Sequence, residues 1–181
     1  MLTKNNLETK EAGGLLEKLS FRSPVANDGP AMYALVERCK PLDVNSLYCY
    51  LILCEHFPST CVIVEKGDEV VGCITAYIPP EKRNTLFVWQ VAVDARMRGQ
   101  GLAKKMLRTL LSRSNLKHTN YIEATVNPSN EASRSLFKSL AKDCSCAFDE
   151  ELIFPAKMFG EGSHEQENLM RVGPIDSVSK T

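Results

Sequence analysis

A six-residue loop, Arg96-Met97-Arg98-Gly99-Gln100-Gly101, has the composition of an anion-binding turn. It follows an apolar run that ends at Val93, and it precedes a segment in which Leu102, Met106 and Leu110 recur with helical spacing. Glycine lets the backbone approach a ligand closely, and the start of a helix presents free N–H groups at its positive end. The loop is therefore expected to bind a phosphate-containing group.

The loop sequence also narrows the kind of phosphate site. Gly99 and Gly101 could form only a tight turn before a helix, which is the commoner use of a glycine pair. Against that, cationic side chains gather near the loop in a chain of zero formal net charge: Arg96, Arg98, Lys104 and Lys105. A dinucleotide-binding loop needs three glycines in the first strand–helix turn, and a P-loop needs Gly-Lys followed by Ser or Thr. The sequence has neither pattern, so another class of phosphate site is expected.

Composition indicates one ordinary globular domain. The chain has 181 residues, of which 44% are hydrophobic and 24% charged, with 22 basic and 22 acidic side chains. The balanced charge argues against nucleic-acid binding, and no apolar run approaches the ~18 residues that a membrane helix needs. We expect a flexible leader at 1–18, one domain at 19–175 and a flexible tail at 176–181.

The cysteines indicate a reducing compartment. There are seven, an odd number, and no Cys-x-x-Cys occurs. His56, His118 and His164 have no metal-finger spacing relative to the cysteines. We therefore expect free thiols, a cytoplasmic protein and no metal site.

The apolar pattern and the turn signals predict a mixed α/β domain with the element order β-α-α-β-β-β-α-β-α-β-β. The expected strands are 19–23, 60–65, 70–78, 85–94, 120–126, 151–154 and 169–172. The expected helices are 30–38, 47–57, 101–113 and 130–141. The second helix is apolar nearly all round and is expected to be largely buried.

The loop and its surroundings resemble the GCN5-related N-acetyltransferases (GNAT). That family binds acetyl-CoA with an Arg/Gln-x-x-Gly-x-Gly/Ala loop, matched here by Arg96-x-x-Gly99-x-Gly101 after a strand that ends in Val-Ala-Val. A second strand–helix unit follows, with Asn130 at its head and Leu136-Phe137 inside. The resemblance implies the GNAT fold, in which a central, mostly antiparallel sheet is splayed between its fourth and fifth strands and flanked by helices.

The resemblance also implies where acetyl-CoA would bind. The pantetheine arm would lie in the gap between the splayed strands, the pyrophosphate would meet backbone N–H groups of the loop, and Asn130 and Phe137 would line the thiol end. The expected cofactor-binding residues are Val91, Ala92, Val93, Arg98, Gly99, Gln100, Gly101, Leu102, Ala103, Asn130 and Phe137.

Three further segments closely resemble the L-2,4-diaminobutyrate acetyltransferases of ectoine biosynthesis, a route to osmoprotection. They include Pro41-Leu42-Asp43-Val44-Asn45-Ser46, Phe87-Val88-Trp89-Gln90 and Glu167-Asn168-Leu169. This resemblance covers the chain from about residue 21 to 175. It implies acetyl transfer to the 4-amino group of L-2,4-diaminobutyrate, an acceptor with two ammonium groups and one carboxylate, and it implies a homodimer.

The acceptor is expected to meet Asp43, Trp89, Glu123, Glu161 and His164. Glu123 lies mid-strand in an apolar segment, where an unpaired carboxylate is costly, although it could instead face outward from an edge strand. Asp43 could bind a cation or form an ordinary Asx turn, and Trp89 could flank an ammonium group or fill core. Glu161 and His164 lie in a Gly-containing loop that would close over the amino acid.

The expected chemistry is direct attack of the amine on the thioester in a ternary complex. A lysine-like amine with a pKa of ~10.4 is mostly protonated at pH 7, and its neutral form costs about 4.6 kcal/mol. Glu123 is expected to accept the proton, directly or through water, and a backbone N–H near Val91 to polarise the carbonyl. Many GNAT members carry a tyrosine as general acid where Phe137 stands, so no general acid is assigned.

Two other functions fit the sequence. The same cofactor site could serve a polyamine, aminoglycoside or protein N-terminal acetyltransferase, which would differ only in its acceptor. The fold could also serve a non-enzymatic acyl-CoA sensor, which would bind CoA without turning over an amine. Glu123 and the Asp43 loop favour an enzyme over a sensor.

Overall fold

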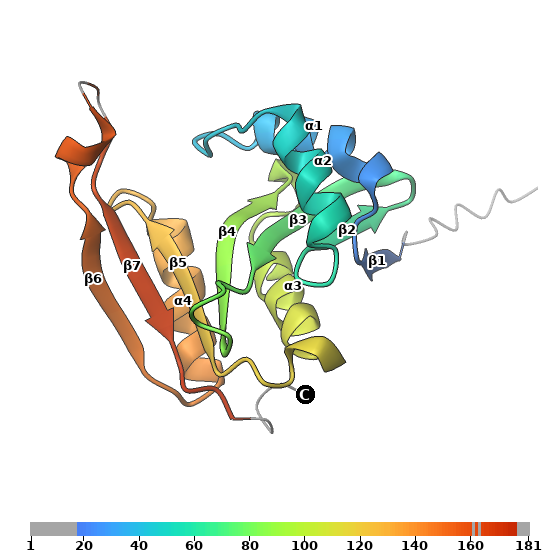
Figure 1. The fold of residues 1–181 in the computed structure, drawn as a ribbon. Helices are drawn as coiled ribbons and strands as arrows, with labels where there is room; N and C mark the ends of the chain where they lie inside the picture. Colours follow the sequence, from blue (N-terminus) through green and yellow to red (C-terminus); the bar gives the residue numbers. More distant parts are fainter. Residues whose placement is uncertain (1–17, 161, 163, 177–181) are drawn as a thin grey trace, which may run out of the picture.

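A seven-stranded sheet with the strand order β1-β2-β3-β4-β5-β7-β6 forms the centre of the computed structural model, which describes residues 18–160, 162 and 164–176 (Figure 1). The strands are β1 (Leu19–Arg22), β2 (Val62–Lys66), β3 (Glu69–Tyr77), β4 (Thr85–Val93), β5 (Tyr121–Val126), β6 (Phe148–Phe154) and β7 (Glu167–Val172). The helices are α1 (Gly29–Arg38), α2 (Leu47–His56), α3 (Leu102–Leu111) and α4 (Glu131–Asp143). Short 3-10 helices are η1 (Ala26–Asp28), η2 (Ala95–Met97), η3 (Ser114–Leu116) and η4 (Ala156–Phe159). The predicted order of strands and helices is confirmed.

The sheet is mostly antiparallel, and β4 and β5 form its one parallel pair in the part of the chain that the structure describes. These two strands pair only from Thr85 to Phe87 on β4 and from Tyr121 to Glu123 on β5. Beyond Phe87 they diverge (Figure 1). The predicted GNAT-type splay between the fourth and fifth strands is confirmed.

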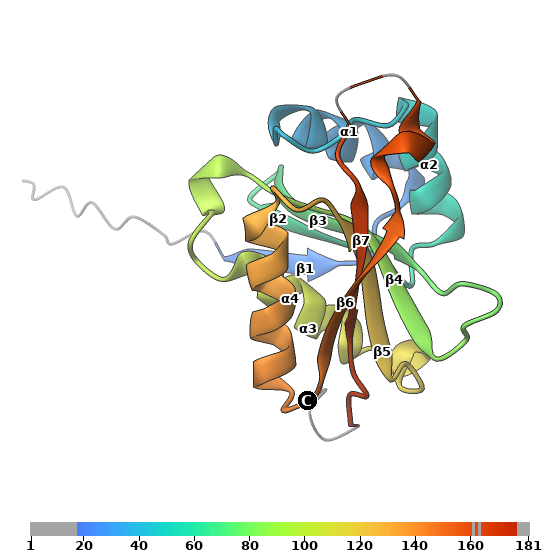
Figure 2. The same cartoon turned by 90° about the vertical axis from the view of Figure 1, so that its left-hand side faces the viewer.

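Helices pack on both faces of the sheet (Figure 2). On one face, Met106 of α3 and Phe137 of α4 join Ile122 of β5 in the larger core cluster. On the other face, Leu35 of α1 and Tyr50 of α2 belong to a second cluster that covers β2, β3 and β4. The two clusters pack against β4 from both faces of the sheet. This packing fixes the position of the strand that precedes the glycine loop.

The expectation that α2 is largely buried is wrong. Tyr50, Leu53 and Cys54 face the core, but Tyr48 is 70% exposed and Leu47 is also exposed. The helix is apolar all round, yet only one side packs against α1 and the sheet. An apolar side of α2 therefore remains at the surface.

The termini and the cysteines bear on two further expectations. The predicted leader and tail lie outside the described residues except for Lys18 and Asp176. All seven cysteines are free, as predicted, and five of them are buried. Burial raises the pKa of the Cys61 thiol to about 11, so this cysteine is a core residue and not a nucleophile.

An ion-pair cluster fastens β1 to β2 and to the start of α1. Arg22 donates to both carboxylate oxygens of Asp28, at 2.7 and 2.8 Å, and its Nε donates to Glu65 at 3.1 Å. Asp28 also accepts from the backbone N–H of Val25 at 2.7 Å. Hydrogen bonding to Arg22 lowers the pKa of Asp28, burial opposes that shift, and Val25 adds to it.

We predict that Asp28→Asn lowers the free energy of unfolding at neutral pH by about 1–3 kcal/mol, because the partly buried Arg22 loses its charged partner. A carboxylate with a lowered pKa contributes stability above its unfolded pKa of ~3.9 and loses it as the pH falls through the folded pKa. Urea unfolding at pH 7 and at pH 3 measures the difference in the free energy of unfolding between wild type and variant. This difference should be smaller at pH 3 than at pH 7. Asp68→Asn, at an exposed turn, is the matched control; equal losses in both variants would contradict the assignment.

Candidate active site

A β-bulge in β4 decides which side chains face the gap between β4 and β5. The register between β3 and β4 shifts at Trp89, which is the extra residue of the bulge. Before the bulge Val88 packs toward the α3–α4 core, and after it Val91 does, so the side-chain alternation is reset by one residue. Trp89 is therefore 42% exposed, and Gln90 is buried toward α2, where the Tyr50 hydroxyl reaches it.

Two adjoining cavities open where β4 and β5 diverge. The first, the inner cavity, has a volume of about 260 Å³ and is lined by Pro41, Leu42, Asp43, Asn45, Val88, Trp89, Gln90, Val91, Ala124, Thr125, Val126, Asn127, Asn130, Ser133, Phe137 and Glu167. The second, the loop cavity, has a volume of about 610 Å³ and is lined by Cys39, Lys40, Pro41, Leu42, Val91, Val93, Met97, Arg98, Gly99, Gly101, Leu102, Ala103, Lys104, Asn130, Ala132, Ser133, Ser135, Leu136 and Ser139. They share Pro41, Leu42, Val91, Asn130 and Ser133 and therefore lie next to each other.

The glycine loop has the backbone conformation that its sequence predicts. Gly99 and Gly101 have φ angles of 74° and 72°, in the left-handed region that favours glycine. A Cβ atom at either position would meet nothing within 4 Å, so the backbone conformation and not crowding requires glycine there. The open space above both glycines belongs to the loop cavity.

The first turn of α3 offers donors to this space. Lys105 N donates to Gly101 O and closes the first turn of the helix. Among the described residues, no group accepts a hydrogen bond from the N–H groups of Leu102, Ala103 or Lys104. These donors lie at the positive end of α3 and suit an anion in the loop cavity.

Most of the expected cofactor-binding residues meet in one place. Eight of the eleven line the loop cavity: Val91, Val93, Arg98, Gly99, Gly101, Leu102, Ala103 and Asn130. Phe137 lines the inner cavity. Ala92 and Gln100 line neither, because Ala92 packs into the α1–α2 core and the Gln100 side chain donates to Arg96 O.

The cationic side chains of the loop are less available than their number suggests. Arg96 donates to Asp94 and to Glu69, and this bonding holds the pKa of Asp94 well below its usual range. Lys104 pairs with Asp143 at 3.0 Å. Arg98 lines the loop cavity and donates to Val93 O, and no described carboxylate pairs with it. An anion here would therefore rely on backbone N–H groups, Arg98 and Lys40, which also lines the loop cavity.

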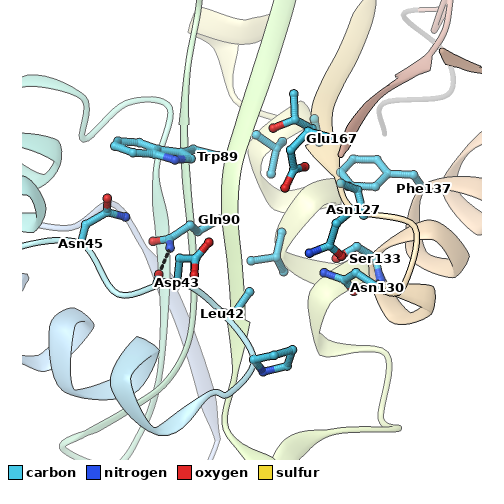
Figure 3. Close-up of a pocket in the computed structure, with 16 residues that line it drawn as sticks. Leu42, Asp43, Asn45, Trp89, Gln90, Asn127, Asn130, Ser133, Phe137 and Glu167 are labelled. Atoms are coloured by element: carbon cyan, nitrogen blue, oxygen red, sulfur yellow. Dashed lines mark hydrogen bonds between the residues drawn. The ribbon is translucent and has the colours of Figure 1, made fainter. Parts of the chain in front are cut away.

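The inner cavity has the opposite electrostatic character. Two carboxylates line it, Asp43 from the β4 side and Glu167 from the β5 side (Figure 3). Other polar side chains drawn there include the amides of Asn45, Gln90, Asn127 and Asn130 and the hydroxyl group of Ser133, and no lysine or arginine is among the lining residues. The arrangement suits a small ligand with more than one positive charge.

Glu167 is the residue that reasoning from the sequence missed. It begins β7, and no described group donates a hydrogen bond to its carboxylate. Burial raises the pKa of Glu167, His164 opposes that shift, and Asp43 and Glu165 add to it. The one signal in the sequence is its place in the Glu167-Asn168-Leu169 segment. A half-buried, unpaired carboxylate with a raised pKa is the type of group that takes up protons in active sites.

Glu123 lies elsewhere. Its side chain is 2% exposed and lines neither cavity. Its carboxylate accepts from Lys82 Nζ at 2.9 and 3.1 Å and from Arg171 Nη1 at 2.7 Å. The buried carboxylate is therefore paired, as a buried acid must be, but its partners are the cationic side chains of Lys82 and Arg171. The catalytic role expected of Glu123 stays a prediction, and this placement counts against it.

Three of the other expected acceptor residues, Asp43, Trp89 and His164, lie at or next to the inner cavity. Asp43 is 90% exposed at its side chain, and its Oδ2 lies 3.9 Å from His164 Nε2. His164 stacks on the Phe159 ring with centroids 3.9 Å apart. Trp89 lines the inner cavity from the same side as Gln90 and Asp43 (Figure 3). Glu161 lies outside the described residues.

Within 18–160, 162 and 164–176, no three His, Cys, Asp or Glu side chains come together in a way that could hold a metal ion. In the same part of the chain, no helix combines the length and the apolar character that crossing a membrane requires.

The chain matches proteins of known family along most of its length. Residues 29–141 match the acetyltransferase (GNAT) family model. An L-2,4-diaminobutyric acid acetyltransferase from Marinococcus halophilus is 44% identical over 171 residues, which cover 93% of this chain and 99% of that protein. A second one, from Bordetella parapertussis, is 45% identical over 86% of this chain and 84% of its own length.

Solved structures agree with these relatives. The diaminobutyrate acetyltransferase of Paenibacillus lautus, in complex with its substrate L-2,4-diaminobutyric acid and coenzyme A, superposes with a TM-score of 0.85 and 41% identity, and the match covers 87% of this chain and 96% of that one. The ribosomal-protein-S18-alanine N-acetyltransferase of Escherichia coli, at 18% identity and a TM-score of 0.62, shares the fold over 87% of this chain and 95% of its own. With the splayed sheet, the glycine loop and these relatives together, the chain belongs to the GNAT acetyltransferases and, within them, to the L-2,4-diaminobutyric acid acetyltransferases.

Proposed function

We propose that this protein transfers the acetyl group of acetyl-CoA to the 4-amino group of L-2,4-diaminobutyrate, which yields N4-acetyl-L-2,4-diaminobutyrate and CoA in ectoine biosynthesis. One observation carries the proposal: an anion-binding loop cavity adjoins an inner cavity lined by two carboxylates. The Paenibacillus lautus relative binds both diaminobutyric acid and coenzyme A, which supports the same pair of ligands here. The product, N4-acetyl-L-2,4-diaminobutyrate, would belong to an osmoprotection pathway.

Acetyl-CoA is the donor. Its pyrophosphate would accept from the N–H groups at the start of α3 and from Arg98, as other phosphates do at helix N-termini. No residue of β5 pairs with Val88–Val93, so the backbone groups on that side of β4 are available to the pantetheine amides. Pairing of that kind adds a strand-like ligand to an open sheet edge. The thioester would then reach the junction of the two cavities near Val91 and Asn130.

Diaminobutyrate is the acceptor that the inner cavity suits. Asp43 and Glu167 would each face one of its two ammonium groups, and Trp89 would flank one of them by a cation–π contact. The side-chain amides of the cavity would donate to its carboxylate. His164, held against Phe159, would close over the bound amino acid near Asp43.

Glu167 is the base that the geometry favours. The reacting amine must lose a proton before it attacks the thioester, and a base with a raised pKa takes that proton more readily than an ordinary carboxylate. A backbone N–H near Val91 would stabilise the oxyanion. Phe137 lines the inner cavity without a hydroxyl group, so the CoA thiolate, with a thiol pKa near the ~8.5 of cysteine, would leave without a general acid from that position.

We predict that Glu167→Gln lowers kcat/KM for diaminobutyrate by about 10²–10⁴, the usual effect of losing a general base. The wild-type kcat/KM should rise with pH through a limb above the ordinary glutamate pKa, because the base must be deprotonated, and the variant should lack this limb. Glu123→Gln is the matched control and should keep the limb while losing stability at its ion pairs. If Glu123→Gln lost the pH-dependent rise of kcat/KM and Glu167→Gln kept it, the assignment of the general base would be reversed.

The acceptor itself is tested with a panel of amines in a CoA-release assay. Because no lysine or arginine lines the inner cavity, a diamine without a carboxylate is the closest competitor, and 1,3-diaminopropane belongs in the panel. We expect L-2,4-diaminobutyrate to have the highest kcat/KM among diaminobutyrate, 1,3-diaminopropane, putrescine, an aminoglycoside and an N-terminal peptide. Acetylation of any other member in preference to diaminobutyrate would contradict the proposal, and CoA binding without turnover would indicate an acyl-CoA sensor.

We further propose a cytoplasmic homodimer whose partners are small molecules and not nucleic acid or membrane. Seven free thiols support a reducing compartment, and equal numbers of acidic and basic residues argue against a nucleic-acid partner. β6 is an edge strand of the sheet, and large apolar side chains are exposed on β6 and η4: Leu152, Ile153, Phe154, Met158 and Phe159. An exposed apolar edge strand is an aggregation risk unless a second copy covers it.

Sedimentation equilibrium tests the dimer. We predict a mass twice the 20.2 kDa of the chain for the wild type, and a shift toward monomer for the double variant Leu152→Lys/Ile153→Lys. Val25→Lys, an exposed apolar residue close to β1 at the opposite edge of the sheet, is the control and should leave the mass unchanged. A monomeric wild type, or a double variant that stays dimeric, would contradict this interface.

A further inference from the structure

The loop that carries Asp43 makes few hydrogen bonds to the rest of the described chain: the Cys39 thiol donates to Val93 O at 3.4 Å, and Leu42 and Val44 pack against the α1–α2 core. The loop spans residues 39–46 between α1 and α2, and the carboxylate of Asp43 is highly exposed. Within the loop, Leu42 N donates to Cys39 O, and Ser46 caps α2 by accepting from Cys49 N. Neither bond fixes the position of Asp43 relative to the sheet. A carboxylate that selects a small acceptor must nevertheless be held in a definite place.

Gln90 makes the link that fixes it. Its Nε2 donates to the backbone carbonyl oxygen of Asp43 at 2.6 Å (Figure 3). Its Oε1 accepts from the Tyr50 hydroxyl at 3.0 Å. In the part of the chain that the structure describes, this is the only hydrogen bond from the Asp43 backbone to the sheet. One amide therefore joins β4, α2 and the Asp43 loop.

The surroundings of Gln90 make this bridge rigid. Its side chain is 7% exposed, and Tyr50 is fully buried. Burial raises the pKa of Tyr50, and hydrogen bonding to Asn45 and Gln90 opposes that shift. The bulge at Trp89 turns Gln90 toward α2, since the residue after a bulge faces the side opposite to the one that regular alternation gives.

We infer that Gln90 is a positioning residue for the acceptor: its amide bridge between Tyr50 and the Asp43 carbonyl holds the Asp43 carboxylate at the mouth of the inner cavity, where it binds an ammonium group of the amino acid. The inference rests on the proposed function, because it needs Asp43 to bind the acceptor. Gln90 acts through the Asp43 backbone, so its loss changes acceptor binding and leaves the donor site intact.

Two variants separate the effect of the Gln90 hydrogen bonds from the effect of the Asp43 charge. Gln90→Met removes both polar atoms of the amide and keeps a side chain of similar length, while the Asp43 carboxylate remains. Asp43→Asn removes the charge and keeps the backbone carbonyl that Gln90 binds. We expect Gln90→Met to raise KM for diaminobutyrate by about five- to tenfold, the equivalent of one hydrogen bond, with KM for acetyl-CoA within about twofold of wild type.

The double variant Asp43→Asn/Gln90→Met decides between indirect and direct action. If Gln90 acts through Asp43, KM for diaminobutyrate in the double variant should equal that of Asp43→Asn alone. Fully additive losses would show that Gln90 contacts the acceptor or acts independently, and would overturn the inference. An unchanged KM for diaminobutyrate in Gln90→Met would overturn it as well.

Further variants keep the test decisive if Gln90→Met folds poorly. Gln90→Glu retains an acceptor for the Tyr50 hydroxyl but places a carboxylate oxygen against Asp43 O, so its KM for diaminobutyrate should rise at least as much. Tyr50→Phe keeps the Gln90–Asp43 bond and should change that KM by less than about threefold. A larger effect in Tyr50→Phe than in Gln90→Glu would indicate a role in packing alone and overturn the inference.

The outcome also separates this inference from the proposed function. If Asp43→Asn leaves KM for diaminobutyrate unchanged, Asp43 does not bind the acceptor and the inference falls with that assignment. If Asp43→Asn raises KM and Gln90→Met does not, the assignment of Asp43 stands and only the positioning role of Gln90 falls.

Discussion

The early end of pairing between β4 and β5 is the constraint on which the rest of this structure depends. The two strands share hydrogen bonds only up to Phe87 and Glu123, and β4 then continues as far as Val93 without a neighbour on that side. Unpaired backbone groups inside a sheet are costly unless another partner satisfies them. In the proposed reaction the pantetheine arm is that partner, so the space proposed for acetyl-CoA exists because the sheet is left incomplete. The inner cavity lies at the same opening, and Val91 lines both cavities.

The bulge at Trp89 adds a second consequence. By resetting the alternation of β4, it directs Val91 toward the α3–α4 core, Trp89 toward the inner cavity and Gln90 toward α2. One strand thus contributes to the donor site, the acceptor site and the anchoring of the Asp43 loop. The charges divide in the same way. The loop cavity offers N–H groups, Arg98 and Lys40, and the inner cavity offers carboxylates, although the chain as a whole is neutral.

Much of the fold could be predicted from the sequence because its signals are local. The glycine loop, the Asn130 cap and the apolar periods of the helices depend on residues a few positions apart. The expected roles of Glu123 and of the loop cations depended instead on distant partners. Lys82 and Arg171 come to Glu123 from other strands and loops, and Glu69 comes to Arg96 from the start of β3. Glu167 was missed for the same reason, since its burial depends on the segments around it and not on its neighbours in sequence. The exposed side of α2 could not be predicted because its apolar pattern fits a buried helix equally well.

In the proposed reaction the two adjoining cavities present the 4-amino group, and not the 2-amino group, to the thioester. NMR of the product formed from acetyl-CoA and ¹⁵N-labelled L-2,4-diaminobutyrate tests this claim directly. The account predicts a single acetamide whose N–H correlates with the protons on C4, together with release of one CoA for each product molecule. A product acetylated on the 2-amino nitrogen, or a mixture of the two, would contradict this account of the site.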